Sequence, residues 1–169
     1  SAAKFVNGMR VQVSIRSTSV FTSNNNVFEV FPYVAIIFDS KFDDISHIHN
    51  WWPRLKTTGV TPEAICFEAI KDVILESSKD KNSYFINISD GAPCYSNGKF
   101  QYSTFAIEHT QSIMNLFKNA NIKIISYFVD YTKNINAYFS KMYGKDAQFI
   151  DCTNLNEIAR SLNKKFLGM

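Results

Sequence analysis

Two patterns of hydrophobic and polar residues predict strands in this chain. From Arg10 to Arg16 apolar and polar residues alternate, which predicts a strand with one buried face. Continuous apolar runs are typical of strands that are covered on both faces. Such runs occupy residues 33–38, 84–88, 122–129 and 147–152.

Between these runs, side chains recur at the three- or four-residue spacing of a buried helix face. The first of these helices follows Thr61-Pro62-Glu63, which supplies a capping residue, a proline and an early acid. Gly144 is expected to end the third helix. The four predicted stripes are Cys66, Ile70, Val73 and Ser77; Ala106, Thr110, Ile113 and Phe117; Ile135, Tyr138, Phe139 and Met142; and Ile158, Leu162 and Phe166.

The order of these elements predicts the fold class. Two strands are followed by helices and strands in alternation, which indicates an α/β fold with three layers around a doubly wound, mostly parallel sheet. The stretch from Ser17 to Pro32 carries little helical pattern, so the strands on its two sides are expected to be antiparallel. We therefore predict one antiparallel edge strand. No linker or repeat divides the chain, which indicates a single domain over residues 1–169.

Composition narrows the class of protein. With 169 residues, 46% of them hydrophobic, the chain can bury an ordinary core. Its longest apolar run, residues 31–38, is far shorter than the roughly 20 residues of a membrane-spanning helix. The three cysteines (Cys66, Cys94 and Cys152) are odd in number and widely spaced, which argues against a disulfide framework or a structural zinc site. We expect a soluble, reduced, cytoplasmic protein.

Charge and motifs argue against several functions. The net charge is +3 and the isoelectric point is 8.7, below the value of about 9 that is typical of a nucleic-acid-binding domain. The sequence contains no phosphate-binding loop, no dinucleotide-binding fingerprint and no nucleophile elbow. Nucleic acid is therefore not the expected partner, and no enzyme motif favours catalysis.

Two loops have a composition that is suited to binding a metal ion. The loop 89–93, which contains Asp90 and Gly91, directly follows the predicted strand 84–88, and the loop 57–61, which contains Gly59 and Thr61, directly precedes a predicted helix. Ligands of open α/β sheets bind at the carboxyl ends of strands, and hard oxygen ligands suit Mg²⁺. Each loop also has an ordinary structural explanation, because Asp-Gly is a common turn and threonine is a common helix cap.

Taken together, these segments resemble a known family. The runs YFINISDGAP and TTGVTPEAICFEAI, with the strands VQVSIRSTS and PYVAIIFDS, are similar to the von Willebrand factor A-type domain over about residues 4–167. The resemblance is strongest to the A-type domain of the cobalt-chelatase large subunit and its phage-encoded relatives. It implies a metal-ion-dependent adhesion site for Mg²⁺ or Mn²⁺, with Thr61 and Asp90 as ligands and Gly59 and Gly91 beside them.

The sequence departs from this family at one motif. The family supplies further ligands from a D-x-S-x-S motif after its first strand, and no such motif occurs here. The nearest serine-rich segment, Ser14 to Ser23, contains no aspartate. We therefore expect the chain to lack the first strand and most of the first helix of the family, which leaves its metal site incomplete.

The resemblance implies a non-catalytic protein-interaction domain. An acidic residue of the partner would complete the coordination of the ion, and the partner implied by the family is a ring-forming AAA+ ATPase in a chelatase-like complex. An acidic cluster of Asp39, Asp43 and Asp44 either faces a partner or forms a solvated turn.

Two alternatives remain open at this point. One is a structural module of a larger assembly, such as a phage particle, without a working metal site. The other is an α/β enzyme that uses Asp90 as an acid or base. A phage-encoded protein would act in the host cytoplasm or in the virion.

Overall fold

The computed structural model describes residues 8–22, 28–55, 62–89, 95–96, 100–101, 104–129, 136–150 and 156–167. The strands are β1 (Gln12–Thr22), β2 (Phe28–Asp39), β3 (Tyr84–Ser89), β4 (Tyr95–Ser96), β5 (Phe100–Gln101), β6 (Lys123–Val129) and β7 (Ala147–Ile150). The helices are α2 (Ser46–Trp51), α3 (Glu63–Ser78), α4 (Thr104–Asn119), α5 (Asn136–Tyr143) and α6 (Asn156–Leu167), with short 3₁₀ helices at Trp52–Arg54 and Gly144–Asp146.

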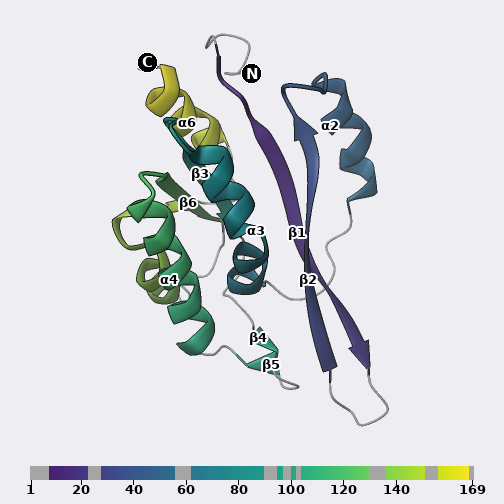
Figure 1. Cartoon of the computed structure of the whole chain (residues 1–169), viewed down its shortest axis with the longest axis vertical. Coiled ribbons are helices and arrows are strands. Elements are labelled where there is room, and N and C mark those ends of the chain that lie inside the picture. The colour runs from purple at the N-terminus through teal and green to yellow at the C-terminus, as the bar shows by residue number, and fades with distance from the viewer. Residues whose placement is uncertain are drawn as a thin grey trace.

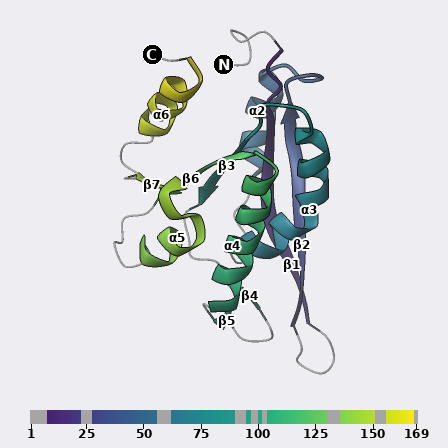
Figure 2. The same ribbon diagram turned by 60° about the vertical axis from the view of Figure 1, so that its left-hand side comes forward.

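A parallel sheet of β3, β6 and β7, in that order, lies between two layers of helices (Figures 1 and 2). The described residues contain two clusters of buried hydrophobic side chains, and residues of β6 belong to one or the other. Ile124 and Phe128 join the larger core with residues of α4 and α5, whereas Ile125 and Tyr127 pack against α6. The predicted three-layer α/β class is therefore confirmed.

The predicted buried faces of the later helices are largely correct. In α4, all four members of the predicted stripe are buried, including Thr110, whose hydroxyl donates to the carbonyl of Ala106 at 2.8 Å. In α6, Ile158 and Leu162 pack against the sheet. Gly144 has a φ of +60°, the conformation that favours glycine at the end of a helix.

The first two strands form a hairpin, as the sequence predicts. β1 pairs with β2 in antiparallel register, from Gln12 opposite Asp39 to Thr22 opposite Phe28. The predicted place of this pair is the edge of the parallel sheet. Within the described residues, however, neither strand pairs with β3, β6 or β7, so the hairpin forms a two-stranded sheet of its own.

Helix α3 packs against the hairpin and against the parallel sheet. Phe67 contacts Phe85 of β3 edge to face, with ring centroids 5.1 Å apart, and Cys66 donates toward the carbonyls of Ser17 in β1 and Tyr33 in β2. The predicted stripe of this helix is only partly correct, because Val73 is 64% exposed.

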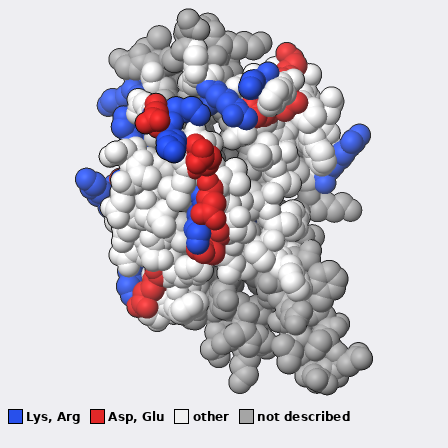
Figure 3. All heavy atoms as spheres, viewed as in Figure 1, with Lys and Arg blue, Asp and Glu red and all other residues white. Residues whose placement is uncertain are grey.

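The outward side of α3 explains that exposure. Glu68, Asp72 and Glu76 recur every four residues along it, and a column of acidic side chains is visible on this face in Figure 3. Val73 adjoins this column in sequence, whereas Ile74 and Leu75 pack against the larger core.

Helix α2 was not predicted, and none of its residues is buried. His47 and Trp51 lie one turn apart on it, and the indole nitrogen donates to His47 Nε2 at 2.9 Å. Within the described residues, no helix combines the length and the hydrophobicity needed to cross a membrane.

Candidate functional site

The predicted ligands Thr61 and Asp90, with Gly59 and Gly91, lie outside the described residues. The elements next to them in sequence are described. Helix α3 begins at Glu63, and β3 ends at Ser89. Asn87 Nδ2 donates to Glu63 Oε1 at 3.2 Å. The first turn of α3 and the carboxyl end of β3 therefore lie side by side.

A buried polar network occupies this junction, and Glu63 is its charged centre. Its Oε1 also accepts from Arg16 Nη2 at 2.8 Å, and its Oε2 accepts from Tyr143 Oη at 2.6 Å. Glu63 and Tyr143 are fully buried. Burial of a carboxylate is costly unless it is paired and hydrogen-bonded, and these contacts meet that requirement.

Asn87 joins the network to the parallel sheet. Its Oδ1 accepts from Arg16 Nη1 at 2.7 Å. Its Nδ2 lies 2.9 Å from both Ser126 Oγ and Tyr143 Oη. We call these five residues (Arg16, Glu63, Asn87, Ser126 and Tyr143) the polar clamp, because they come from β1, α3, β3, β6 and α5 and hold one another.

The electrostatics of the clamp favour a structural role. Burial, together with the nearby carboxylate of Glu63, raises the pKa of Tyr143 well above its usual value. The phenol therefore stays protonated at neutral pH and donates to Glu63. Since the groups of the clamp use one another as partners, we interpret it as a device that holds the elements together.

Cys66 adds a buried thiol near the clamp. Burial raises the pKa of Cys66 to about 11, so its sulfur is a neutral thiol at physiological pH. A nucleophilic cysteine needs a thiolate and a lowered pKa. The structure therefore gives Cys66 a packing role.

The described residues do not themselves make a metal site. They contain no group of three or more His, Cys, Asp or Glu side chains that could hold an ion. The buried hydroxyl of Thr18 has no hydrogen-bond partner among them, but a single neutral oxygen is not a ligand set. The metal prediction therefore rests on Thr61 and Asp90.

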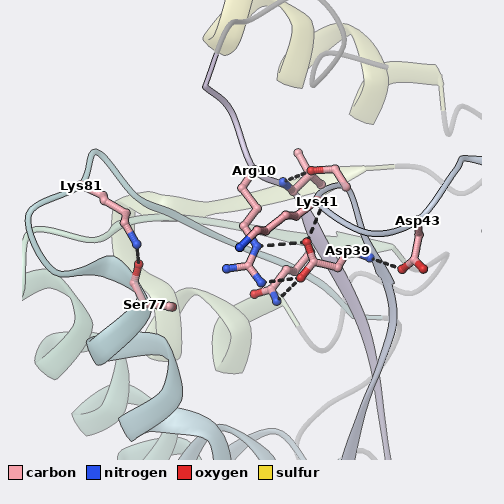
Figure 4. A network of polar contacts seen from close by, with 9 residues as sticks. Arg10, Asp39, Lys41, Asp43, Ser77 and Lys81 are labelled. Carbon is pink, nitrogen blue, oxygen red and sulfur yellow. Dashed lines mark hydrogen bonds and ion pairs between the residues drawn. The ribbon is translucent and has the colours of Figure 1, made fainter.

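Asp39 of the predicted acidic cluster is engaged within the chain rather than solvated, and its contact with a partner stays a prediction. The residue is 7% exposed, and its carboxylate is paired with Arg10, whose Nε lies 3.0 Å from Oδ1 (Figure 4). Gln12 Nε2 and the backbone N–H of Lys41 donate to the same carboxylate. These hydrogen bonds, led by that of Arg10, hold the pKa of Asp39 far below its usual range.

The other two acids of the cluster have local contacts. Asp43 accepts from the backbone N–H of Asp39 at 2.7 Å, and Asp44 accepts from the backbone N–H of Ser46 at the start of α2 at 3.0 Å. Asp44 is exposed and Asp43 is half-buried. Of the three, Asp44 is the one whose position suits contact with a partner.

The acidic cluster and the polar clamp lie at different heights along β1. Asp39 is opposite Gln12, whereas the clamp begins at Arg16. Four residues of strand span about 13 Å. The cluster is thus at the amino end of β1, away from the clamp and from the junction of α3 with β3.

Comparisons with known proteins add no assignment. No protein-family model, no curated protein and no solved structure matches the chain significantly. The resemblance to the von Willebrand factor A-type domain therefore stays a prediction.

Removal of the clamp carboxylate is expected to destabilise the fold. Glu63→Ala removes the acceptor that Arg16 and Tyr143 share, and loss of one partner from a buried ion pair typically costs about 3–5 kcal/mol. Urea denaturation will measure the free energy of unfolding. Glu76→Ala, at an exposed position of the same helix, should change it by less than about 0.5 kcal/mol. Equal effects of the two variants would contradict the clamp.

The contact of Arg10 with Asp39 predicts a pH dependence of stability. Because the folded pKa of Asp39 is lowered, its contribution is present above the unfolded value of about 3.9 and is lost as the pH falls toward the folded pKa. Between about pH 6 and pH 3, Asp39→Asn should therefore lose less free energy of unfolding than the parent chain.

Urea denaturation at each pH will test this, with Asp72→Asn on the exposed side of α3 as the matched control. The control should follow the parent curve, and Arg10→Gln should follow Asp39→Asn. Parallel curves for Asp39→Asn and the parent would show that this ion pair does not set the acid sensitivity.

Proposed function

We propose that this chain is a non-catalytic protein-interaction domain that binds its partner at the carboxyl end of the parallel sheet. The proposal includes a divalent cation, Mg²⁺ or Mn²⁺, and an AAA+ ATPase of a chelatase-like complex as the partner. It places the protein in the cytoplasm, in keeping with the free, buried thiol of Cys66.

One observation carries this proposal, namely the hydrogen bond between Glu63 and Asn87. It fixes the first turn of α3 against β3 near the carboxyl end of that strand. Thr61 stands two residues before Glu63, and Asp90 directly follows Ser89. The two segments that the sequence predicts to carry the ligands are thus attached to neighbouring elements.

The chemistry of the two side chains supports a hard cation. A threonine hydroxyl and an aspartate carboxylate are oxygen donors, which Mg²⁺ and Mn²⁺ prefer. Thr61 and Asp90 are the residues of this chain that would hold the ion. When bound, the cation would supply a coordination position for a carboxylate of the partner.

The proposal favours binding over catalysis because of the state of the described polar groups at this junction. Glu63, Asn87 and Tyr143 are buried and engaged with one another, so they support the site mechanically. A general acid or base must instead reach its substrate.

Cation binding is the first test. Calorimetric titration with Mg²⁺ or Mn²⁺ should show saturable binding by the parent chain, and Asp90→Ala and Thr61→Ala should each lose it because each removes an oxygen ligand. Asp72→Ala, which removes an exposed carboxylate elsewhere, should bind as the parent does. Circular dichroism will confirm that each variant is folded. No binding by the folded parent would favour the structural-module alternative.

Partner binding is measured next with the same proteins. A purified AAA+ ring of the chelatase class should bind the parent in Mg²⁺ but not in EDTA, and should not bind Asp90→Ala. Binding that is equal in Mg²⁺ and EDTA would contradict a metal-bridged contact. It would leave a metal-independent interaction domain.

A further inference from the structure

The outer edge of β3 carries backbone groups that point away from its neighbour. The N–H of Lys123 in β6 donates to the carbonyl of Ser83 at 2.9 Å, and Tyr84 is in register with Lys123. In a parallel ladder the N–H and C=O of one residue point to the same side, and successive residues alternate. Phe85, Asn87 and Ser89 therefore point to β6, whereas Tyr84, Ile86 and Ile88 point to the opposite edge.

Within the described part of the chain, no strand pairs with that edge. The sequence of β3, YFINIS, contains no charged residue and no proline. Native proteins commonly protect a free strand edge with lysine, proline or a bulge, because an unprotected edge is a template for another strand. The edge of β3 has none of these residue types.

Two side chains of β3 on the face toward α6 are also exposed, next to its outer backbone edge. On the face toward α6, Ile125 and Tyr127 of β6 are at most 1% exposed, but their register partners Ile86 and Ile88 of β3 are 38% and 53% exposed. Side-chain burial on this face therefore decreases from β6 to the neighbouring strand β3. An additional strand beside β3 would cover these two isoleucines.

The surroundings of the edge define what can bind there. The side chain of Arg16 in β1 donates to the side chain of Asn87 in β3 at 2.7 Å, so the hairpin and β3 are separated by the length of these two side chains. The hairpin of the same chain thus borders this edge. Such a border obstructs the edge of a second folded copy, whereas an extended segment presents only the width of a single strand.

We propose that the outer edge of β3 binds an extended peptide segment of a partner protein by β-strand addition. Main-chain hydrogen bonds to Tyr84, Ile86 and Ile88 supply the affinity. The segment carries apolar side chains on the face of Ile86 and Ile88, and small or hydrogen-bonding side chains on the face of Asn87. This interaction goes beyond the proposed metal-dependent contact, because it requires neither the cation nor Thr61 and Asp90.

Amide hydrogen exchange, followed by NMR, tests the edge in the chain alone. The amides of Ile86 and Ile88 should exchange at least about tenfold faster than those of Phe85 and Asn87, which donate to β6. The neighbouring amides of one strand thus serve as internal controls. Equal protection of all four would overturn the proposal, because the edge would already be covered. Protection that grows with protein concentration would identify a second copy as the occupant and would also overturn it.

Peptide binding tests the occupant. The probe is a lysine-flanked peptide in which seven central residues alternate between valine and threonine, and the control peptide carries N-methyl groups on alternate amides. In EDTA, the first peptide should bind and should slow exchange at Ile86 and Ile88 at least about fivefold, whereas the methylated peptide should do neither. Failure of the unmethylated peptide to bind, or equal binding by both, would overturn the proposal.

Two variants locate the binding site. Ile88→Pro removes an outward N–H while leaving the donors to β6, and Ile86→Lys places a charge on the edge. Each should weaken peptide binding at least about fivefold. Val73→Lys, a matched gain of charge at an exposed apolar position of α3, should not change it. Unchanged binding by both folded edge variants would place the peptide elsewhere and overturn the proposal.

Discussion

The polar clamp is the interaction on which the arrangement of the hairpin and the parallel sheet depends. The hairpin and the parallel sheet are not joined by strand pairing within the described residues, so side chains must connect them. Arg16 does this because its Nη2 donates a hydrogen bond to Glu63 and its Nη1 donates one to Asn87. Because the guanidinium is planar and rigid, the two contacts fix direction as well as distance.

Apolar packing beside the clamp makes the same connection through α3. The guanidinium carbon of Arg16 lies over the ring of Phe67, 5.2 Å from the ring centroid, and the same ring contacts Phe85 of β3 edge to face. An ion pair alone is a weak source of stability because its charges must leave water. The ring supplies apolar burial at the same position. The clamp therefore sets which elements meet, while the neighbouring core supplies most of the free energy.

The fold could be predicted further than the site because hydrophobic periodicity depends on local sequence. Ala106, Ile113 and Phe117 revealed the buried face of α4 through their spacing alone. Glu63 gave no comparable signal, because an acid in the first turn of a helix is also favoured by the helix dipole. Asn87 did leave a clue, as a polar residue within an apolar strand. Its partners come from distant parts of the chain, which periodicity does not identify. The burial of Asp39 was not predicted for the same reason, since its partner Arg10 lies 29 positions away.

Alternate residues of β3 serve different purposes, because some hold the polar clamp and the others form the proposed binding edge. Asn87 points its side chain into the clamp and its backbone toward β6, so it is committed to the fold in both directions. Ile86 and Ile88 have the opposite orientation in both respects, with exposed side chains and outward backbone groups. The residues that hold the hairpin in place are therefore not those that would receive an added strand. A partner segment that binds along β3 would therefore leave the clamp intact, and the clamp would keep α3 in position.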